Sequence, residues 1–199
     1  MVIVGASGHG KVIAEIIEAC FGALPYHFMD KKPMASFFNR KVVLPSPLAQ
    51  GAELVIAVGN NRTRRQLAES FREQAFPTLV HPRANVSTSV RIGFGTVVMA
   101  GASINADAVI GQHVILNTNC SVDHDCRVDD FVHLSPNAAL AGNVHVGEGA
   151  HIGIGASVIQ GIVIGKWVTV GAGAVIIENV PDFAVVVGVP GKVIKYNTD

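Results

Sequence analysis

An aliphatic residue occupies every sixth position from Val80 to Ile176 without interruption. A period of six matches neither the 3.6-residue turn of an α-helix nor the two-residue alternation of a half-buried strand. It is typical of a parallel β-helix, in which each hexad forms one short face and a turn, and three hexads close a triangular coil. The pattern predicts about five to six coils stacked roughly 4.8 Å apart. The anchors, expected inside the prism, are Val80, Val86, Ile92, Val98, Ile104, Ile110, Leu116, Val122, Val128, Leu134, Leu140, Val146, Ile152, Val158, Ile164, Val170 and Ile176.

The residues that follow each anchor support this interpretation. The fourth position after most anchors holds a small or β-branched residue, which leaves room beside the anchors, and Gly or Asp often follows the anchor directly. Cys120 and Cys126 fall at two of these inward positions and are expected to act as small apolar fillers. A sandwich of ordinary strands would instead show unequal strand lengths and a drifting period.

Residues 1–79 lack the sixfold register and alternate short apolar runs with helical spacing. Strands are expected at 2–4, 26–29 and 54–58, and helices at 11–20 and 62–74. Such alternation predicts a small Rossmann-like α/β domain with a parallel sheet. The chain is therefore expected to divide into this domain at 1–79 and a β-helix domain at 80–199. The β-helix domain is expected to close with a strand folded back at 185–187 and a turn at 188–192.

A glycine-rich loop at 5–10 (Gly-Ala-Ser-Gly-His-Gly) is expected to join the first strand to the first helix. Backbone N–H groups and the helix dipole favour a phosphate at such a junction. The spacing G-x-x-G-x-G differs from the G-x-G-x-x-G of dinucleotide folds, so nicotinamide binding is not supported. Asp30 and Gly59 follow the next two strands on the same sheet edge, and the three strand ends together favour a nucleotide or nucleotide-sugar site. The alternative is that these glycines only make tight turns.

His124 is flanked by Asp123 and Asp125, and the register places this cluster at the turn or outer surface of its hexad. A neighbouring carboxylate orients a histidine and makes it more basic, which suits a general base near pH 7. Gly142 stands one coil above His124, where its backbone N–H group is placed to face a ligand.

A second pair of histidines follows the same register. His133 and His151 each fall five positions after an anchor and are eighteen residues apart. Because three hexads make one coil, we expect these two side chains to stack one above the other on the same edge.

Composition narrows the functional classes. The 199 residues carry 15 Lys and Arg against 15 Asp and Glu and show no basic run, which argues against a nucleic-acid binder or a polybasic membrane-surface module. The mean hydropathy is +0.41, yet no apolar stretch approaches the ~18 residues of a membrane helix. The N-terminus lacks the features of a signal peptide. Three cysteines form no disulfide or zinc pattern and suit a reducing cytoplasm.

These residues resemble the hexapeptide-repeat acyltransferases of bacterial glycan assembly, in the sialic-acid O-acetyltransferase-like family. Within it, the chain is similar to the N-acetyltransferases that act on UDP-4-amino-4,6-dideoxy sugars of the bacillosamine type. The stretches that carry the resemblance span nearly the whole chain in order. They are Gly5-Ala6-Ser7-Gly8-His9-Gly10, Ile56-Ala57-Val58-Gly59-Asn60-Asn61, Leu116-Asn117-Thr118, His124-Asp125-Cys126, Ala141-Gly142-Asn143-Val144 and Gly188-Val189-Pro190.

The resemblance implies a left-handed β-helix that transfers acetyl directly from acetyl-CoA to the sugar 4-amino group, without an acyl-enzyme. In that family the histidine matching His124 is the general base, and the acid matching Asp125 raises its basicity. The glycine matching Gly142 offers its amide to the developing oxyanion.

The same resemblance implies the ligand contacts. Members are homotrimers without a metal, in which acetyl-CoA lies along the groove between neighbouring prisms. The acetyl-CoA contacts are the residues matching His133, Ile154 and Ala172. The nucleotide-sugar contacts are those matching Ser7, Gly8, His9, Asp30 and Gly59.

Three positions depart from the family pattern. Lys31 stands where some relatives have a second acid after Asp30. Gly191 replaces the usual alanine before Lys192, and Asp125 is often Glu in close relatives.

Three other functions stay open at this point. O-acetylation of a sialic acid or related sugar would use the same machinery on a hydroxyl acceptor. A zinc hydratase of the γ-carbonic-anhydrase type shares the trimeric β-helix but needs two histidines five residues apart, a spacing that no two histidines here have. A non-catalytic scaffold would leave the Asp-His-Asp cluster unexplained.

Overall fold

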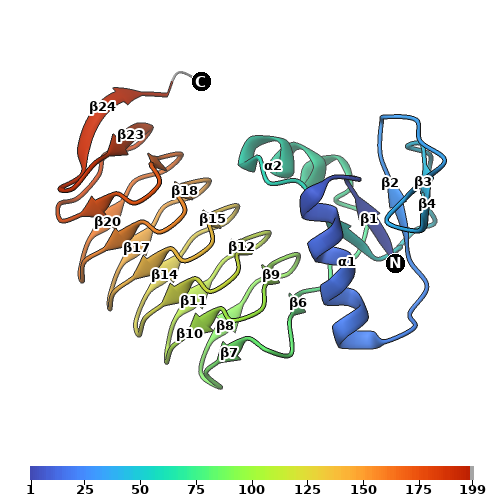
Figure 1. The fold of residues 1–199 in the computed structure, drawn as a ribbon, viewed down its shortest axis with the longest axis horizontal. Helices are drawn as coiled ribbons and strands as arrows, with labels where there is room; N and C mark the ends of the chain where they lie inside the picture. The colour runs from blue at the N-terminus through green and yellow to red at the C-terminus, as the bar shows by residue number, and fades with distance from the viewer. Residues whose placement is uncertain (198–199) are drawn as a thin grey trace.

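The chain folds into a small α/β domain beside a tall stack of coils (Figure 1). The computed structural model describes residues 1–197. The α/β domain holds one sheet in the order β3-β4-β2-β1-β5, in which β3 is antiparallel to β4 and the other neighbours are parallel. Its elements are β1 (Val2–Val4), α1 (Gly8–Phe21), β2 (His27–Met29), β3 (Ser36–Phe37), β4 (Arg40–Val43), β5 (Leu54–Ile56) and α2 (Asn61–Ser70).

Helix α1 begins at Gly8 and not at the expected Lys11, so Gly8, His9 and Gly10 form its first turn instead of a loop. A Cβ atom on Gly10 would lie 2.5 Å from the carbonyl oxygen of Gly5. Glycine therefore allows the helix to approach the end of β1 closely. The expectation of a loop was wrong because glycine disfavours helices on average, and this tertiary contact is not visible in the sequence.

Two further differences lie in the same domain. Helix α2 ends at Ser70, before the expected Gln74. The hairpin of β3 and β4 occupies a stretch for which no strand was expected, and its first strand has only two residues, too short for a pattern to show.

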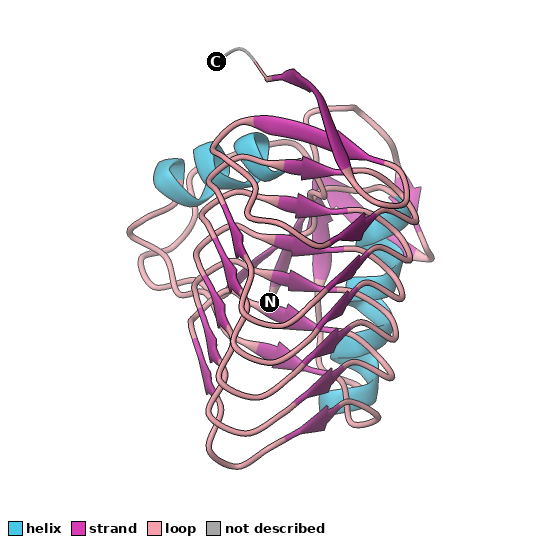
Figure 2. Cartoon of the chain, turned by 90° about the vertical axis from the view of Figure 1, so that its left-hand side faces the viewer, coloured by secondary structure: helices cyan, strands magenta, loops and turns pink. Residues whose placement is uncertain are grey.

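The β-helix consists mainly of two-residue strands that form three parallel sheets, one for each face of a triangular prism (Figure 2). We name each face by its first strand. The β6 face contains β6 (Leu79–Val80), β9 (Val97–Val98), β12 (Ile115–Leu116), β15 (His133–Leu134), β18 (His151–Ile152), β21 (Thr169–Val170) and β23 (Ala184–Val187). The β7 face contains β7 (Asn85–Val86), β10 (Ser103–Ile104), β13 (Ser121–Val122), β16 (Ala139–Leu140), β19 (Ser157–Val158) and β22 (Val175–Ile176). The β8 face contains β8 (Arg91–Ile92), β11 (Val109–Ile110), β14 (Arg127–Val128), β17 (His145–Val146) and β20 (Val163–Ile164).

From β6 to β22, paired strands are eighteen residues apart, as Leu116 is from Leu134. From Val98 to Ile176 every anchor lies inside the prism with an exposed fraction of 3% or less. Anchors of the first coil are partly buried. Removing these aliphatic side chains from water supplies most of the favourable free energy of a fold with such short strands. The predicted left-handed parallel β-helix is confirmed.

From Ile92 to Val170, the third residue after each anchor sits in a turn with positive φ, for example +57° at Asn119 and +59° at Asp125. Most side chains disfavour this left-handed conformation, whereas Gly, Asn and Asp tolerate it. The preference explains why these small residues recur there. His113, Phe131 and Trp167 adopt the same conformation, with φ of +52°, +59° and +55°. Bulky side chains at such positions indicate packing contacts that offset the unfavourable backbone conformation. All three residues lie on the same edge of the prism.

The C-terminal end differs from the expected closure. The segment predicted to fold back, 185–187, instead continues the β6 face as β23, parallel to β21. The strand that folds back is β24 (Lys192–Tyr196), antiparallel to β23, after the expected turn (Figure 1). The sixfold register ends near Pro181, because β23 pairs with β21 at a spacing of sixteen residues and not eighteen, as Val170 does with Val186. The stack nevertheless gains this one further strand.

The three edges of the prism have different neighbours. The histidine edge consists of the turns from the β7 face to the β8 face, such as 123–126. The domain edge consists of the turns from the β8 face to the β6 face, such as 129–132. The third edge consists of the turns from the β6 face to the β7 face, such as 135–138. The α/β domain packs on the β6 face, where Leu79, Val97 and Ile115 join the core formed by α1. The histidine edge, between the other two faces, therefore lies on the far side of the prism.

A buried arginine joins the α/β domain to the coils. Arg64 of α2 is 1% exposed. Its Nε donates to the carbonyl oxygen of His113 at 2.8 Å, and its Nη2 donates to that of Phe131 at 2.7 Å. Its Nη1 donates to the carbonyl oxygens of Val58 and Gly59 at 3.1 and 3.2 Å. Burial lowers the pKa of Arg64 to about 9, so the guanidinium is still charged at neutral pH.

The neighbouring amide extends this junction. Asn61 accepts a hydrogen bond from Arg64 through Oδ1 at 2.9 Å. Its Nδ2 donates to the carbonyl oxygens of Gly149 and Ala150 at 2.9 and 3.1 Å. Together the two side chains bind backbone carbonyls on three successive coils, which fixes the α/β domain along the domain edge.

Replacing Arg64 with Met should destabilise the protein by about 3 kcal/mol or more, because several buried carbonyl oxygens lose their donors. The free energy of unfolding in urea measures this effect. The matched control is Arg72→Met, since the Arg72 side chain is 83% exposed, and its expected effect is within about 0.5 kcal/mol. A loss at Arg64 no larger than that at Arg72 would contradict the structural role of this junction.

Candidate active site

The histidine edge carries the predicted His124 cluster as expected. His124 and Asp125 are each 61% exposed, and Nδ1 of His124 lies 2.8 Å from Oδ2 of Asp125. Asp123 Oδ1 accepts from the backbone N–H of His124 and from Nδ2 of Asn105, both at 2.8 Å. The cluster is therefore held by hydrogen bonds on one side and open to solvent on the other.

Asp125 serves both the turn and the histidine. Its positive φ is one that Asp tolerates well, so the backbone conformation favours a short acidic residue here. The Asp125 carboxylate is long enough to reach the His124 ring. The departure noted from the sequence therefore leaves the His–carboxylate pair intact.

The electrostatics of His124 suit a proton acceptor. The hydrogen bond that His124 donates to the Asp125 carboxylate raises the pKa of His124, and the charge of Asp123 acts in the same direction. With the carboxylate at Nδ1, the neutral ring carries its proton on that nitrogen and leaves Nε2 as the acceptor.

Gly142 lies directly against the His124 ring, one coil further along. A Cβ atom at Gly142 would lie 2.7 Å from Cε1 and 2.8 Å from Nε2 of His124, closer than any side chain can approach. Glycine is therefore required for the ring to keep its position. Among the described residues the Gly142 N–H group has no hydrogen-bond partner, which leaves a donor beside Nε2.

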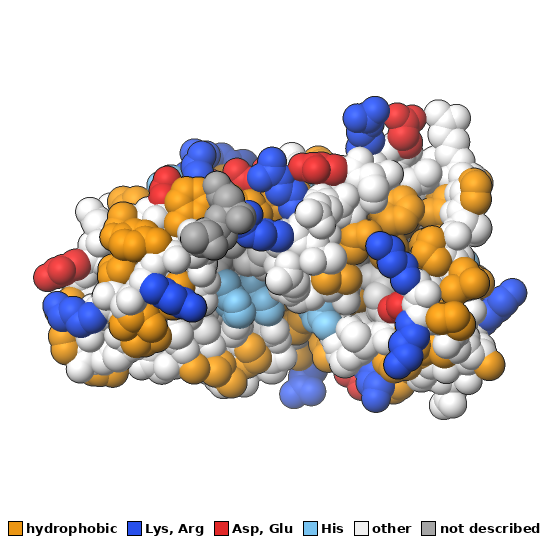
Figure 3. Space-filling model, turned by 90° about the horizontal axis from the view of Figure 1, so that it is seen from above, with side chains coloured by type: hydrophobic (Ala, Val, Ile, Leu, Met, Phe, Trp, Pro, Cys, Tyr) orange, Lys and Arg blue, Asp and Glu red, His pale blue; other side chains and the backbone are white. Residues whose placement is uncertain are grey.

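A second group of histidines lies at the seam between the two domains. The His133 and His151 rings stack with centroids 4.8 Å apart and planes 3° apart, as the eighteen-residue spacing predicted. His9 and the backbone of Gly59 lie beside His133. In Figure 3, histidine side chains are visible in the hollow between the two parts of the molecule.

The pKa values of these seam histidines are shifted in the opposite direction to that of His124. Burial lowers the pKa of His133 to about 3 and that of His9 to about 4. Burial also lowers the pKa of His151, and the positive charge of Arg64 adds to the effect in all three. They are therefore neutral at pH 7 and act as hydrogen-bonding groups. Nε2 of His9 is buried and has no hydrogen-bond partner within residues 1–197.

The seam opens into a cleft of about 500 Å³ between the start of α2 and the β6 face. Its lining is Gly59, Asn60, Asn61, Arg62, His133, Gly149, His151, Trp167, Thr169 and Asn197. Trp167 was not predicted to belong to a site. The Arg62 guanidinium lies 4.9 Å from the centre of its ring, and Asn197 donates to its carbonyl oxygen at 3.2 Å. The sequence did contain a signal for this residue, because a tryptophan is unusual at a turn position that favours Gly, Asn or Asp.

A separate pocket lies at the carboxyl ends of β1, β2 and β5, where the nucleotide was predicted. Asp30 Oδ2 accepts from the backbone N–H of Ala6 at 2.8 Å, and its Oδ1 accepts from that of Lys32 at 2.9 Å. Asp30 therefore shapes the loop before α1 as well as facing the pocket. Ser7 and Gly8 are exposed at the N-terminus of that helix, open to a ligand.

The remaining predicted contacts lie elsewhere. Ile154 and Ala172 are exposed on the third edge, one coil apart. The structure thus brings His9, Gly59 and His133 together and places His124 across the prism from them. Among residues 1–197, no cluster of three or more His, Cys, Asp or Glu is arranged to hold a metal ion. No helix in the same range is long and apolar enough to cross a membrane.

Comparison with known proteins gives a consistent result. Residues 1–71 match the family described as the PglD N-terminal domain. The UDP-N-acetylbacillosamine N-acetyltransferase of Bacillus subtilis is 46% identical over 104 residues, which cover 47% of this chain and 48% of that protein. The match thus spans about half the length of this curated relative.

Two solved structures extend the similarity over nearly the whole chain. The acetyltransferase domain of PglB from Neisseria gonorrhoeae gives a TM-score of 0.93 at 42% identity, over 97% of this chain and 98% of that one. That domain has also been solved in complex with acetyl coenzyme A. A mutant of perosamine N-acetyltransferase from Caulobacter crescentus, in complex with CoA and GDP-perosamine, gives 0.91 at 40% identity, over 100% and 96%.

A prism of hexads with an exposed His–Asp pair, joined to a small α/β domain, is the architecture of a hexapeptide-repeat acyltransferase. Within that class, the chain belongs to the family of acetyl-CoA-dependent sugar N-acetyltransferases that these proteins represent.

Replacing Asp125 with Asn should lower the pKa of His124 toward 6.5, because a neutral amide stabilises the imidazolium less than a carboxylate does. Titration of the His124 ring protons by NMR measures the shift. Asp107→Asn is the matched control, since Asp107 occupies the same turn position one coil earlier. An unchanged His124 pKa in Asp125→Asn, or an equal shift in the control, would contradict this electrostatic role.

Proposed function

We propose that the chain transfers the acetyl group of acetyl-CoA to the 4-amino group of a UDP-4-amino-4,6-dideoxy sugar. The observation that carries this proposal is the His124–Asp125 pair with the unpaired N–H group of Gly142 beside its free Nε2. The named functions of the relatives, which are sugar N-acetyltransferases, support it.

The chemistry follows from these groups. The neutral sugar amine attacks the thioester carbonyl, so that a C–N bond forms and the C–S bond breaks. His124 Nε2 accepts the proton that the amine loses and returns it to the departing CoA thiolate. The Gly142 N–H group donates to the oxyanion of the tetrahedral intermediate. Transfer is direct, because the nearby Cys126 is buried and its pKa is raised by burial, which makes it a poor nucleophile.

The predicted contact residues fall into two sets, one for each substrate. Ser7, Gly8, His9, Asp30 and Gly59 would hold the nucleotide sugar, and His133, Ile154 and Ala172 would hold acetyl-CoA. His9 and His133, which are neutral and partly without partners, can orient a polar ligand at the seam without repelling an amine.

The positions of these residues support a homotrimer with shared sites. The α/β domain packs on the β6 face, whereas His124 is on the edge opposite that face. A sugar held at the seam therefore reaches His124 of a neighbouring chain and not that of its own. Each groove would combine the seam and third edge of one chain with the histidine edge of the next.

An amine acceptor should be preferred over a hydroxyl. With acetyl-CoA supplied, we expect mass spectrometry to show acetylation of UDP-4-amino-4,6-dideoxy-N-acetylglucosamine when it competes with N-acetylneuraminate. UDP-N-acetylglucosamine is the matched control, because it carries a hydroxyl at the position of the amine, and it should remain unmodified. Preferential acetylation of the sialic acid would replace the proposed function by sugar O-acetylation.

Mixing two impaired variants, each altered at a different residue, tests the shared site. His124→Ala should lower kcat by about 10² to 10⁴, and Asp30→Ala should raise KM for the nucleotide sugar while leaving KM for acetyl-CoA unchanged. In an equimolar mixture of exchanged subunits, about a quarter of the grooves would pair an intact Asp30 with an intact His124. The activity at low nucleotide-sugar concentration should therefore rise to about a quarter of wild type. A mixture no more active than its parents would place both residues in one chain's site.

A further inference from the structure

The proposed trimer determines which faces of the prism border each groove. On every chain the β7 face joins the third edge to the histidine edge. A groove that pairs the third edge of one chain with the histidine edge of the next, repeated around a threefold axis, turns all three β7 faces toward that axis. The outer walls of the groove would then be the β6 face of one chain, with its α/β domain, and the β8 face of the next.

The outward side chains of the β7 face suit a position near the axis. From β10 to β19 these side chains are all small, namely Ser103, Ser121, Ala139 and Ser157. Small side chains allow two prisms to approach closely. The β8 face is therefore left to face the nucleotide sugar that a neighbouring α/β domain would hold.

The β8 face carries a cluster of three polar side chains, Arg127, Asp129 and His145, which we call the β8-face cluster. Nε of Arg127 donates to Oδ1 of Asp129 at 2.8 Å, and Nε2 of His145 donates to Oδ2 at 3.0 Å. The Asp129 side chain is 22% exposed, whereas that of Arg127 is 68% exposed. Because Arg127 uses only Nε in this cluster, its two Nη groups are left to solvent or to a ligand.

The fold does not require a charge at the position of Arg127. The same outward column contains Val109 one coil earlier and Val163 two coils later. An exposed ion pair contributes little to stability, so the packing of the face does not explain why an arginine is present. The cluster holds the guanidinium by one nitrogen and presents the other two, which is an arrangement suited to a phosphate group.

The cations at the seam, where the nucleotide sugar would lie, are engaged with other groups. Arg64 donates to backbone carbonyl oxygens, and the Arg62 guanidinium lies over the Trp167 ring. His9 and His133 are neutral at pH 7, because burial lowers their pKa values to about 4 and about 3. A diphosphate that is removed from water between two chains is costly unless it is paired, so it needs a positive charge from elsewhere.

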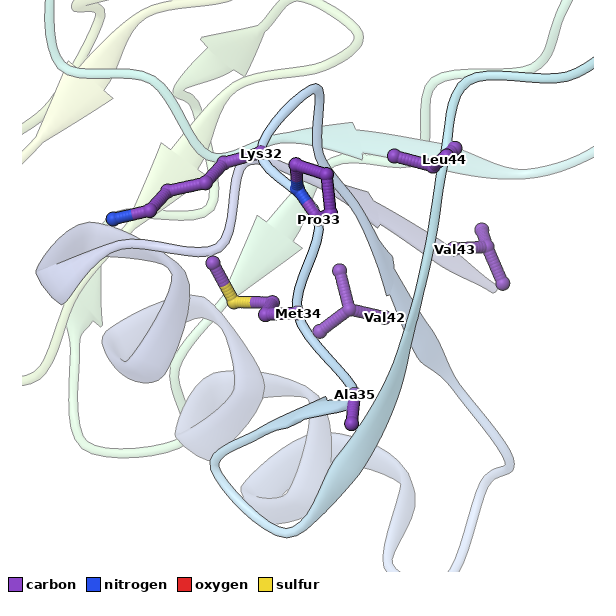
Figure 4. A pocket seen from close by; sticks show the side chains of 7 residues that line it. All are labelled: Lys32, Pro33, Met34, Ala35, Val42, Val43 and Leu44. Carbon is purple, nitrogen blue, oxygen red and sulfur yellow. The ribbon is translucent and has the colours of Figure 1, made fainter.

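Two lysines of the same α/β domain lie away from the seam cleft. Lys31 lines the nucleotide pocket at the end of β2, and Lys32 borders an adjacent apolar hollow. In Figure 4 the Lys32 side chain extends away from the apolar residues of this hollow, which are Pro33, Met34, Ala35, Val42, Val43 and Leu44. Neither lysine lines the seam cleft. The charge would therefore come from the facing wall of the groove.

We propose that Arg127 of one chain binds the diphosphate of the nucleotide sugar held by its neighbour, and that Asp129 positions Arg127 for this contact. Arg127 follows His124 by three residues, a chain length of at most about 11 Å. In a 4-amino sugar one pyranose ring separates the amine from the anomeric carbon that bears the diphosphate. An amine at His124 therefore places the diphosphate beside the β8 face, where a guanidinium can form paired hydrogen bonds with phosphate oxygens. This inference rests on the proposed function, because it takes a nucleotide-linked amino sugar and a shared groove as its premises.

Steady-state kinetics test the contact. Arg127→Ala should raise KM for UDP-4-amino-4,6-dideoxy-N-acetylglucosamine about tenfold, the usual contribution of hydrogen bonds to a charged group. It should leave kcat and KM for acetyl-CoA near wild type, because the diphosphate does not change during the reaction. Asp129→Asn should raise the same KM by a smaller factor, since Arg127 keeps its charge but loses its orientation.

The chain provides a matched control on the same face. Arg91 occupies the outward column of Arg127 two coils earlier and is also exposed. Arg91→Ala removes the same charge far from His124 and should leave all three kinetic constants unchanged. An unchanged KM for the nucleotide sugar in Arg127→Ala, or an equal rise in Arg91→Ala, would overturn the inference.

Subunit mixing identifies the chain that contributes Arg127. In an equimolar mixture of Arg127→Ala and Asp30→Ala, about a quarter of the grooves would be fully intact, because one chain supplies Asp30 and the next supplies Arg127. Activity at low nucleotide-sugar concentration should therefore exceed that of either parent. A mixture of Arg127→Ala and His124→Ala should show no such gain, since both residues come from the same chain. The opposite pattern would assign Arg127 to the chain that holds the nucleotide and refute the proposal.

Calorimetry with free UDP and free CoA, titrated separately on the full chain, distinguishes failure of this inference from failure of the proposed function. Arg127→Ala should weaken UDP about tenfold and leave the Kd for CoA unchanged. No binding of UDP by the wild type, equal UDP affinity in the two proteins, or an equal loss for CoA would contradict the role of Arg127. A selective loss of UDP binding in a chain that acetylates no amino sugar would refute the proposed function alone. Acetyl transfer that is indifferent to Arg127 would refute this inference alone.

Discussion

The eighteen-residue coil is the constraint on which the other features depend. Because each residue lies above the one three hexads earlier, His124 meets Gly142, and His133 meets His151. The same repeat aligns the carbonyl oxygens to which Arg64 and Asn61 donate. A single inserted residue in one hexad would misplace every later coil, so the site and the domain junction rely on the same aliphatic register as the core.

The fold places the same residue type in two opposite electrostatic environments. On the histidine edge, the hydrogen bond to the Asp125 carboxylate and the charge of Asp123 raise the pKa of His124. At the seam, burial and the charge of Arg64 keep His9 and His133 neutral. The buried Arg64 thus has two effects, since it fixes the α/β domain and also adds to burial in lowering the pKa of the histidines beside it. In the proposed reaction one imidazole must take a proton while the others only orient, and this difference in environment separates the two roles.

The sequence predicted what is periodic or local and missed what is neither. The stacked His133 and His151 follow directly from their spacing, as does the position of His124 at a turn. Arg64 could not be found in this way, because its partners are backbone carbonyls up to 68 residues away, which leave no trace in residue type. The early start of α1 depends on the contact between Gly10 and Gly5, which exists only after the sheet has formed. Trp167 did leave a signal, an aromatic ring at a left-handed turn position.

The separation of the two ligand regions gives assembly a chemical role in the proposed function. Arg64 and Asn61 fix the α/β domain against three coils, so the nucleotide pocket cannot swing round the prism to the histidine edge of its own chain. Positioning an amine within reach of a thioester contributes a large part of the rate of such a reaction. Here that positioning would come from the packing of one prism against the next and not from closure of a domain. In the proposed trimer, the rigid junction within each chain would place the nucleotide sugar opposite His124 of the neighbouring chain as soon as the assembly forms.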